Sequence, residues 1–113
     1  MTDCIFCKIS KRQLPAKLVY EDDELFAFED ITPQAPEHIL ICSRNHQPTL
    51  GDFSLQDAAL LGRALLLAAK LAEQRKLGAG YRIVVNNGRG AGQTVFHLHF
   101  HLLGGRDFQW PPG

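Results

Sequence analysis

The sequence has no excess of charge of either sign. Its 113 residues contain twelve basic and twelve acidic side chains, and nowhere do lysines and arginines form a run. It therefore lacks the continuous positive face along which a long nucleic acid binds. Any ligand related to nucleic acids is expected to be small.

Long apolar runs and cysteines are also scarce. No apolar stretch approaches the roughly 20 residues of a membrane span, and the first residues, MTDCIFCKISKRQ, lack the hydrophobic core of a signal peptide. We therefore expect a cytoplasmic protein. Three cysteines are too few for a disulfide framework, so a reducing compartment makes Cys4-x-x-Cys7 a candidate metal clip. Cys42, inside the apolar run HILICS, is expected to be a small buried side chain.

What the chain does have is apolar material for one small core. Hydrophobic residues make up 45% of it, and no repeat or linker divides it, which predicts a single domain over residues 1–113. Extended segments bounded by turn residues are expected at 17–22, 24–30, 37–43, 81–86 and 95–103. Five such short segments predict an antiparallel sheet.

One long helix is expected between the third and fourth strands, at about residues 54–77. Ser54 and Asp57 have the spacing of a capping box, and Gly78 suits a left-handed stop. Apolar residues form two adjacent stripes along this helix: Leu61, Leu65, Ala68 and Ala72 in one, and Leu60, Ala64, Leu67 and Leu71 in the other. We expect one stripe to pack on the sheet and the other on a second subunit, although loops of the same chain could cover it instead.

Three of the five histidines alternate with apolar residues in the segment QTVFHLHFHLLGG. On a strand, side chains two residues apart share a face, so His97, His99 and His101 should form one row. Three imidazoles on one face are a poor choice for filling a dry core. The row therefore indicates either a metal site or an imidazole nucleophile with neighbouring imidazoles as donors.

The residues before this row favour phosphate chemistry. The strand and the preceding loop contain no carboxylate, whereas a metallohydrolase would usually draw one into the site. The loop instead contains Gly88, Gly90 and Gly92, followed by Gln93 and Thr94, which suit an anionic ligand. Glycines serve a hairpin turn equally well, so the loop carries weight only because the histidines lie beside it.

Several motifs together resemble the histidine triad superfamily. HLHFHLL has its pattern of histidine and apolar residues, and AFEDITPQAPEHILI, NNGRGAGQTVFHLHFHLLGGR and the terminal WPPG resemble its Hint branch, the purine nucleoside phosphoramidases. The resemblance implies an α+β fold, a five-stranded antiparallel sheet with one long and one short helix, and a homodimer. It also implies hydrolysis of the P–N bond in nucleoside 5′-phosphoramidates such as adenosine phosphoramidate or aminoacyl adenylates.

The resemblance also implies roles for particular histidines. His99 resembles the nucleophile that attacks the α-phosphorus, and a hydrogen bond from its Nδ1–H to a main-chain carbonyl would leave Nε2 free to attack. His101 and His38 resemble flanking donors to the phosphate oxygens. His97 completes the triad but is expected to orient rather than react.

Further residues resemble the family's substrate contacts. Asp30 resembles the carboxylate that accepts both ribose hydroxyls, although it also suits a turn before Thr32-Pro33. The other positions are Asn86, Gly92, Gln93 and Thr94 for the phosphate and leaving group, Phe6, Ile9 and Ile31 for the base pocket, and Trp110 at the partner subunit's site. The animal enzymes tend to have serine where this chain has Thr94, and the extra methyl group stiffens χ1 at that position.

The resemblance also suggests how the Cys4 and Cys7 pair is completed. Some bacterial members with this pair add a histidine after the third strand and the first triad histidine, which correspond to His46 and His97 here. Four such ligands would hold a structural zinc. Reduced thiols beside an empty site are the alternative.

Two other classes of function remain open from the sequence. A protein that binds nucleotides without turning them over would have the same pocket. A dinucleoside polyphosphate hydrolase or nucleotidyl transferase of a sister branch would have the same histidines. Turnover separates the first class from the proposed hydrolase, and substrate comparison separates the second.

Overall fold

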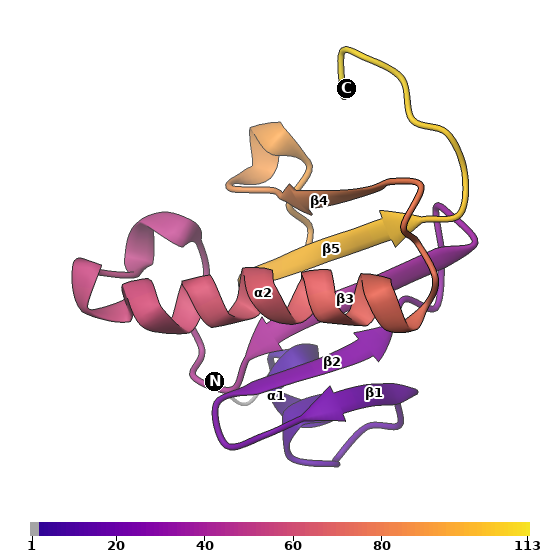
Figure 1. Cartoon of the computed structure of the whole chain (residues 1–113). Coiled ribbons are helices and arrows are strands. Elements are labelled where there is room, and N and C mark those ends of the chain that lie inside the picture. Colours follow the sequence, from indigo (N-terminus) through magenta and orange to yellow (C-terminus); the bar gives the residue numbers. More distant parts are fainter. Residues whose placement is uncertain (1–2) are drawn as a thin grey trace.

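The structure, a computed structural model, describes residues 3–113, which form one antiparallel sheet with a helix on each face (Figure 1). The strands are β1 (Leu18–Glu21), β2 (Leu25–Glu29), β3 (Glu37–Ser43), β4 (Tyr81–Val85) and β5 (His99–Gly104). The helices are α1 (Ile5–Ser10) and α2 (Ala58–Gln74), with single 3₁₀ turns η1 (Leu50–Asp52), η2 (Leu55–Asp57) and η3 (Arg89–Ala91). The strand order is β1-β2-β3-β5-β4. This confirms the predicted α+β fold with five antiparallel strands, one long helix and one short helix.

The last strand differs from the prediction at its beginning. Residues 95–103 were expected to be extended, but β5 begins only at His99, which pairs with Cys42 of β3. The preceding residues leave the sheet because the Leu98 N–H donates to the carbonyl of Gln47, in the loop after β3, at 2.8 Å. His97 therefore lies before the strand rather than on it, and the expected row of three strand histidines is wrong for its first member.

The sheet separates two apolar clusters because residues alternate along each strand. The larger cluster lies between the sheet and α2, and the smaller one lies on the α1 face. In β3, Ile39 and Ile41 belong to the first cluster, whereas Leu40 and Cys42 belong to the second. Cys42 is fully buried, which confirms the prediction for that side chain.

Helix α2 is shorter than predicted at both ends. Ser54 and Asp57 do form a capping box, but they cap the 3₁₀ turn η2 that precedes the helix. The predicted left-handed stop at Gly78 is wrong, because Lys76 takes that conformation with φ of +60°. The chain turns back there, and Leu77 N–H closes the helix by donating to the Ala72 carbonyl at 2.9 Å. No helix within residues 3–113 has the length and apolar character needed to cross a membrane.

The two apolar stripes of α2 do not separate as predicted. The sheet buries members of both, namely Ala64, Ala68, Leu71 and Ala72. Leu65 and Leu66 remain 44% and 71% exposed. The apolar surface of α2 that remains exposed is therefore smaller than the full second stripe that we expected to face a partner.

Gly104, the last residue of β5, should not tolerate a side chain. A Cβ atom built there would lie 2.6 Å from Leu77 Cδ1 and 2.9 Å from Leu77 Cδ2, inside the packed core. Because overpacking strains a core, we expect Gly104→Ala to lower the free energy of unfolding by about 1–3 kcal/mol in urea titrations. Gly78→Ala, where no atom lies within 4 Å of the added carbon, is the matched control and should change it by less than about 0.5 kcal/mol. Equal stability of the two variants would contradict this account.

Candidate active site

Three imidazoles converge on the sheet face that α2 does not cover. His38 comes from β3 and His99 and His101 come from β5, and these strands are hydrogen-bonded neighbours. The ring centroids of His99 and His101 are 4.8 Å apart, and those of His38 and His101 are 5.2 Å apart. The structure thus brings together the three histidines that were expected to act on a phosphate.

The hydrogen bond made by His99 determines which of its nitrogens is free. His99 Nδ1 lies 2.8 Å from the main-chain carbonyl oxygen of His97. A carbonyl only accepts, so Nδ1 must carry the proton. The Nε2 atom of neutral His99 therefore keeps its lone pair, which is the arrangement a nucleophile requires.

A second series of hydrogen bonds sets the tautomers of the two flanking histidines. The main-chain N–H of Gln34 donates to His38 Nδ1 at 3.0 Å, so the proton of neutral His38 is on Nε2. That Nε2–H donates to His101 Nδ1 at 2.9 Å. The remaining Nε2–H of His101 is then a donor available to an anion.

Burial keeps these imidazoles neutral. It lowers the pKa values of His38 and His99 and is the largest cause in each case. Burial also lowers the pKa of His101 to about 4, with further lowering from the neighbouring His99 and His38. Asp30 opposes these shifts without cancelling them. At neutral pH the cluster therefore offers a lone pair and N–H donors rather than positive charge.

Asp30 lies at the edge of this cluster and makes the expected turn contact. Its Oδ1 accepts the Thr32 N–H at 2.9 Å, as a turn residue does. Its Oδ2 lies 3.5 Å from His38 Nε2. The adjacent Ile31 is 95% exposed, so its side chain is not packed into a wall within this chain. Asp30, His38 and His101 also lie close enough to form a possible metal-binding group.

Helix α1 supplies the apolar border of the site. Phe6 is buried, and its ring meets the His99 ring edge to face with 5.0 Å between centroids. Ile9 packs against the apolar cluster on the α1 face, to which Phe6 belongs. Both expected pocket residues therefore lie on the histidine side of the sheet, and Phe6 contacts His99 directly.

Gln93 holds the glycine loop in place, whereas the sequence led us to expect that the loop would present Gln93 to a phosphate. The buried Gln93 side chain accepts the Gly88 N–H at 2.8 Å and donates to the carbonyls of Pro48 and Val95. Its own main-chain N–H is bonded to the Gly88 carbonyl. Gln93 therefore organises the loop and has no donor left over, which differs from the direct phosphate contact expected of it.

The other loop and tail residues are more open. Asn86 follows β4 and is half-buried, Thr94 is exposed, and Gly92 has φ of +91°. Trp110 is 82% exposed, and Figure 1 shows the tail that carries it extending away from the sheet. A single chain therefore does not bring Trp110 to the histidines.

A second cluster lies behind His99 and consists of sulfur and nitrogen atoms. Cys4 Sγ and Cys7 Sγ lie 3.3 Å and 3.5 Å from His97 Nδ1. His46 Nδ1 lies 3.4 Å from Cys7 Sγ and 3.2 Å from His97 Nδ1. Tetrahedral sulfur and nitrogen ligands of a zinc-sized ion are separated by roughly 3.3 to 3.8 Å, so these four residues fit a tetrahedral metal centre.

The hydrogen bonding of His97 supports the same interpretation. Its ring is fully buried, and Nε2 donates to the Ser43 carbonyl at 2.7 Å, which leaves the Nδ1 lone pair facing the two sulfurs. Burial and the adjacent Cys4 raise the pKa of the Cys7 thiol, so forming the thiolate there is unfavourable. A bound cation would stabilise that thiolate. The ring of His97 thus contacts the two cysteine sulfurs, while its main-chain carbonyl accepts the hydrogen bond from His99.

Two contacts in the site could not be found from sequence. The Gln34 N–H that orients His38 and the Ser43 carbonyl that orients His97 are both main-chain groups. Almost any residue type can supply a main-chain N–H or carbonyl, so such a contact cannot be recognised from the sequence. The nearest signal is the pair of prolines in TPQAP, which indicates a tight turn before His38.

The lowered pKa of His101 predicts how stability depends on pH. Between pH 6.5 and about 4 the unfolded chain binds a proton at His101 that the folded chain refuses, so acid should destabilise the protein over this window. One such group contributes at most about 1.4 kcal/mol per pH unit. We expect the free energy of unfolding of His101→Asn to fall less steeply over this window than that of the unsubstituted protein. Parallel curves in urea titrations would contradict the assigned protonation.

Comparison with known proteins identifies the family. The model of the HIT domain matches residues 11–108. An uncharacterized HIT-like protein of Synechocystis is 51% identical over 98% of this chain and 97% of its own. The crystal structure of a HIT family hydrolase from Legionella pneumophila has a TM-score of 0.96 and 48% identity, covering 98% of this chain and 100% of that one. A histidine triad nucleotide-binding protein from Candida albicans has a TM-score of 0.83 and 34% identity, covering 96% of this chain and 83% of that one.

The family match spans all five strands of the sheet and the three histidines His38, His99 and His101. The chain belongs to the HIT domain family and is similar to hydrolases of that family.

Proposed function

We propose that this protein hydrolyses the P–N bond of purine nucleoside 5′-phosphoramidates, such as adenosine phosphoramidate or aminoacyl-adenylate-type substrates, through a nucleotidyl-His99 intermediate. The observation that carries the proposal is the hydrogen bond from His99 Nδ1 to the His97 carbonyl, which leaves Nε2 as a nucleophile. Resemblance to the Hint branch adds the phosphoramidate specificity. The Legionella relative, named a hydrolase, supports hydrolysis in general.

The proposed reaction has two steps. His99 Nε2 attacks the α-phosphorus, the P–N bond breaks, and the leaving amine takes up a proton from solvent, which the attacking water replaces in the second step. Water then displaces His99 and releases the nucleoside monophosphate. In both steps the Nε2–H of His101, directed by His38, would donate to a phosphate oxygen whose charge grows in the transition state.

Substrate recognition is assigned to the residues around this cluster. Asp30 would accept the ribose hydroxyls, since one of its oxygens faces the histidines and is not used by the turn. Phe6 and Ile9 would line one side of the base, and Ile31 would contact it where the loop is open. Asn86, Gly92 and Thr94 would face the phosphate or the leaving amine, within a loop that Gln93 holds in place. The Candida relative, named as nucleotide-binding, supports this class of ligand.

We propose that the protein acts as a homodimer. Leu65, Leu66 and Tyr81 are exposed apolar side chains on α2 and β4. Within residues 3–113, β4 pairs only with β5 and is therefore an edge strand, and such an edge is normally covered in a stable protein. A second copy would cover these groups, and the exposed Trp110 could then reach the partner subunit's site.

We propose that the second cluster holds a structural zinc ion, bound by Cys4, Cys7, His46 and His97. When bound, zinc would supply no chemical step but would join the N-terminal segment to the residues before β5. The four donor atoms leave no open position for substrate. Unpaired Cys4 and Cys7 also fit the reducing cytoplasm expected from the sequence.

The nucleophile is tested by trapping the intermediate. Mixing the protein with adenosine phosphoramidate and quenching rapidly with base should give a chain heavier by one adenylyl group, detected by mass spectrometry. His99→Ala should form no adduct, lose turnover by at least about a thousandfold and still bind AMP. Base is required because acid would cleave the P–N adduct. Turnover or adduct that survives in His99→Ala would remove His99 from this role.

The same experiment separates the remaining classes of function. AMP binding without turnover by the unsubstituted protein would indicate a nucleotide-binding protein. Faster turnover of a dinucleoside polyphosphate than of the phosphoramidate would indicate the sister branch.

The zinc is tested by metal analysis of protein purified without a polyhistidine tag. We expect about one zinc per chain, from four ligands in one closed site, and its loss in the double variant Cys4→Ser, Cys7→Ser. The midpoint of thermal unfolding should fall by several degrees in that variant, because a ligand that binds only the folded state stabilises it. Cys42→Ala, which removes the thiol outside the cluster, is the matched control and should retain zinc. Turnover of the folded double variant should drop only modestly, and complete loss of turnover would contradict a structural role.

A further inference from the structure

The chain after β5 holds the turn that leads to His38. Gly105 has φ of +92°, and a Cβ atom built on it would lie 2.9 Å from Pro36 Cβ. The next residue, Arg106, donates from Nε to the carbonyl of Gln34 at 3.1 Å. The turn formed by residues 34–36 thus leaves no room for a side chain at position 105 and is hydrogen-bonded by the residue that follows.

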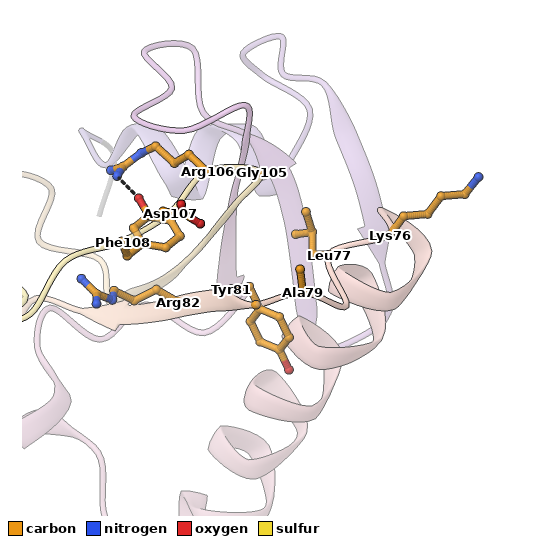
Figure 2. A pocket seen from close by; sticks show the side chains of 10 residues that line it. Lys76, Leu77, Ala79, Tyr81, Arg82, Gly105, Arg106, Asp107 and Phe108 are labelled. Carbon is orange, nitrogen blue, oxygen red and sulfur yellow. Dashed lines mark hydrogen bonds between the residues drawn. The ribbon is translucent and has the colours of Figure 1, made fainter.

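The side chain of Arg106 is itself held by the tail. Its guanidinium lies over the Phe108 ring, 4.3 Å from the centroid, and its Nη1 donates to the Asp107 carbonyl at 3.1 Å. Arg82 of β4 lies 5.1 Å from the same ring centroid and donates to the Gln109 carbonyl at 2.9 Å. Figure 2 shows the Phe108 ring between the two guanidinium groups. The position of Arg106 therefore depends on where the tail lies.

Gln34 connects this cluster to the histidines through its main chain. Its carbonyl accepts from Arg106, and its N–H donates to His38 Nδ1. Its side-chain amide donates to the Thr32 carbonyl, two residues earlier in the chain, at 3.0 Å. Among the described residues, Arg106 is the only side chain that donates to the Gln34 carbonyl, on the side of that residue opposite its bond to His38.

We propose that Arg106 is a positioning residue, which holds the Gln34 turn so that the Gln34 N–H maintains His38 in the tautomer that donates to His101. This inference rests on the proposed function and adds a residue to it. Without the Arg106 contact, the Gln34 N–H would point less steadily at His38 Nδ1. The proton of His38 would then be shared between its two nitrogens, and His101 would lose the donor that orients it.

The rival explanation is that Arg106 acts only through its charge. It lines an open pocket with Lys76 and Arg82, whose side chains extend in different directions (Figure 2). Positive charge around this pocket would attract an anionic substrate wherever that substrate bound. Charge attraction changes substrate binding and leaves the tautomer of His38 alone. Positioning changes the tautomer and the chemical step. The two explanations therefore predict different measurements.

The test compares Arg106→Ala with Lys76→Gln, which removes one positive charge from the same pocket without touching the turn or the tail. For Arg106→Ala we expect kcat to fall about three- to tenfold, the range for one lost hydrogen bond, with KM changed less than about twofold. Lys76→Gln should change neither. Both variants should retain the thermal unfolding midpoint within a few degrees, because both side chains are exposed.

The tautomer is measured directly, without substrate, from the nitrogen chemical shifts of ¹⁵N-labelled histidine, with His38→Asn identifying the signals of His38. The unsubstituted protein should show His38 protonated on Nε2, and Arg106→Ala should show proton density on both nitrogens. An unchanged tautomer overturns the proposal, whatever happens to kcat, and so does an equal fall of kcat in both variants. If the tautomer changes in a protein whose unsubstituted form turns over no phosphoramidate, the positioning role stands and the proposed function fails.

Discussion

The site depends on one hydrogen bond, from Nδ1 of His99 to the main-chain carbonyl of His97. It decides which face of the His99 imidazole carries a lone pair, and every other group of the site is useful only once that choice has been made. The bond exists because the chain leaves the sheet before His99, so that the His97 carbonyl is not used in pairing with β3. Bonding of Leu98 to Gln47 maintains this departure. The sulfur cluster restrains the same residue from the other side through the His97 ring.

The histidines have defined tautomers because main-chain groups determine which ring nitrogen carries the proton. Carbonyls of His97 and Ser43 can only accept, and the N–H of Gln34 can only donate, so three imidazoles have no choice of tautomer. His101 then follows from His38. Burial supports this order by keeping the rings uncharged, since a proton added to His38 or His101 would occupy the Nδ1 atom that now accepts and would break that hydrogen bond. Rigid main-chain atoms thus do what flexible side chains would do less reliably.

Much of this arrangement could be predicted from residue patterns, and the failures have common causes. Alternation in HILICS and HLHFHLL predicted the strands and the face of His99 and His101 correctly, because a strand separates its two faces by a period of two. The pattern continued through His97 although the strand did not, because a hydrogen bond to a distant loop ended it. The left-handed residue at Lys76 was missed because lysine carries no signal for that conformation. Gln93 was assigned to the phosphate because its type suits a donor, whereas its donors are consumed by carbonyls that only the folded chain brings near.

The alternation in β5 has a consequence for how the protein must fold. Phe100 and Leu102 face α2, while His99 and His101 lie together on the opposite face of the sheet. If β5 slipped by one residue against β3, both imidazoles would enter the apolar core and both apolar side chains would replace them in the site. A chain with the slipped register would lose both the stability that comes from apolar burial and the arrangement of the histidines. Selection for a stable core and selection for a working site therefore act on a single variable, the pairing register of two strands, and neither can drift without the other.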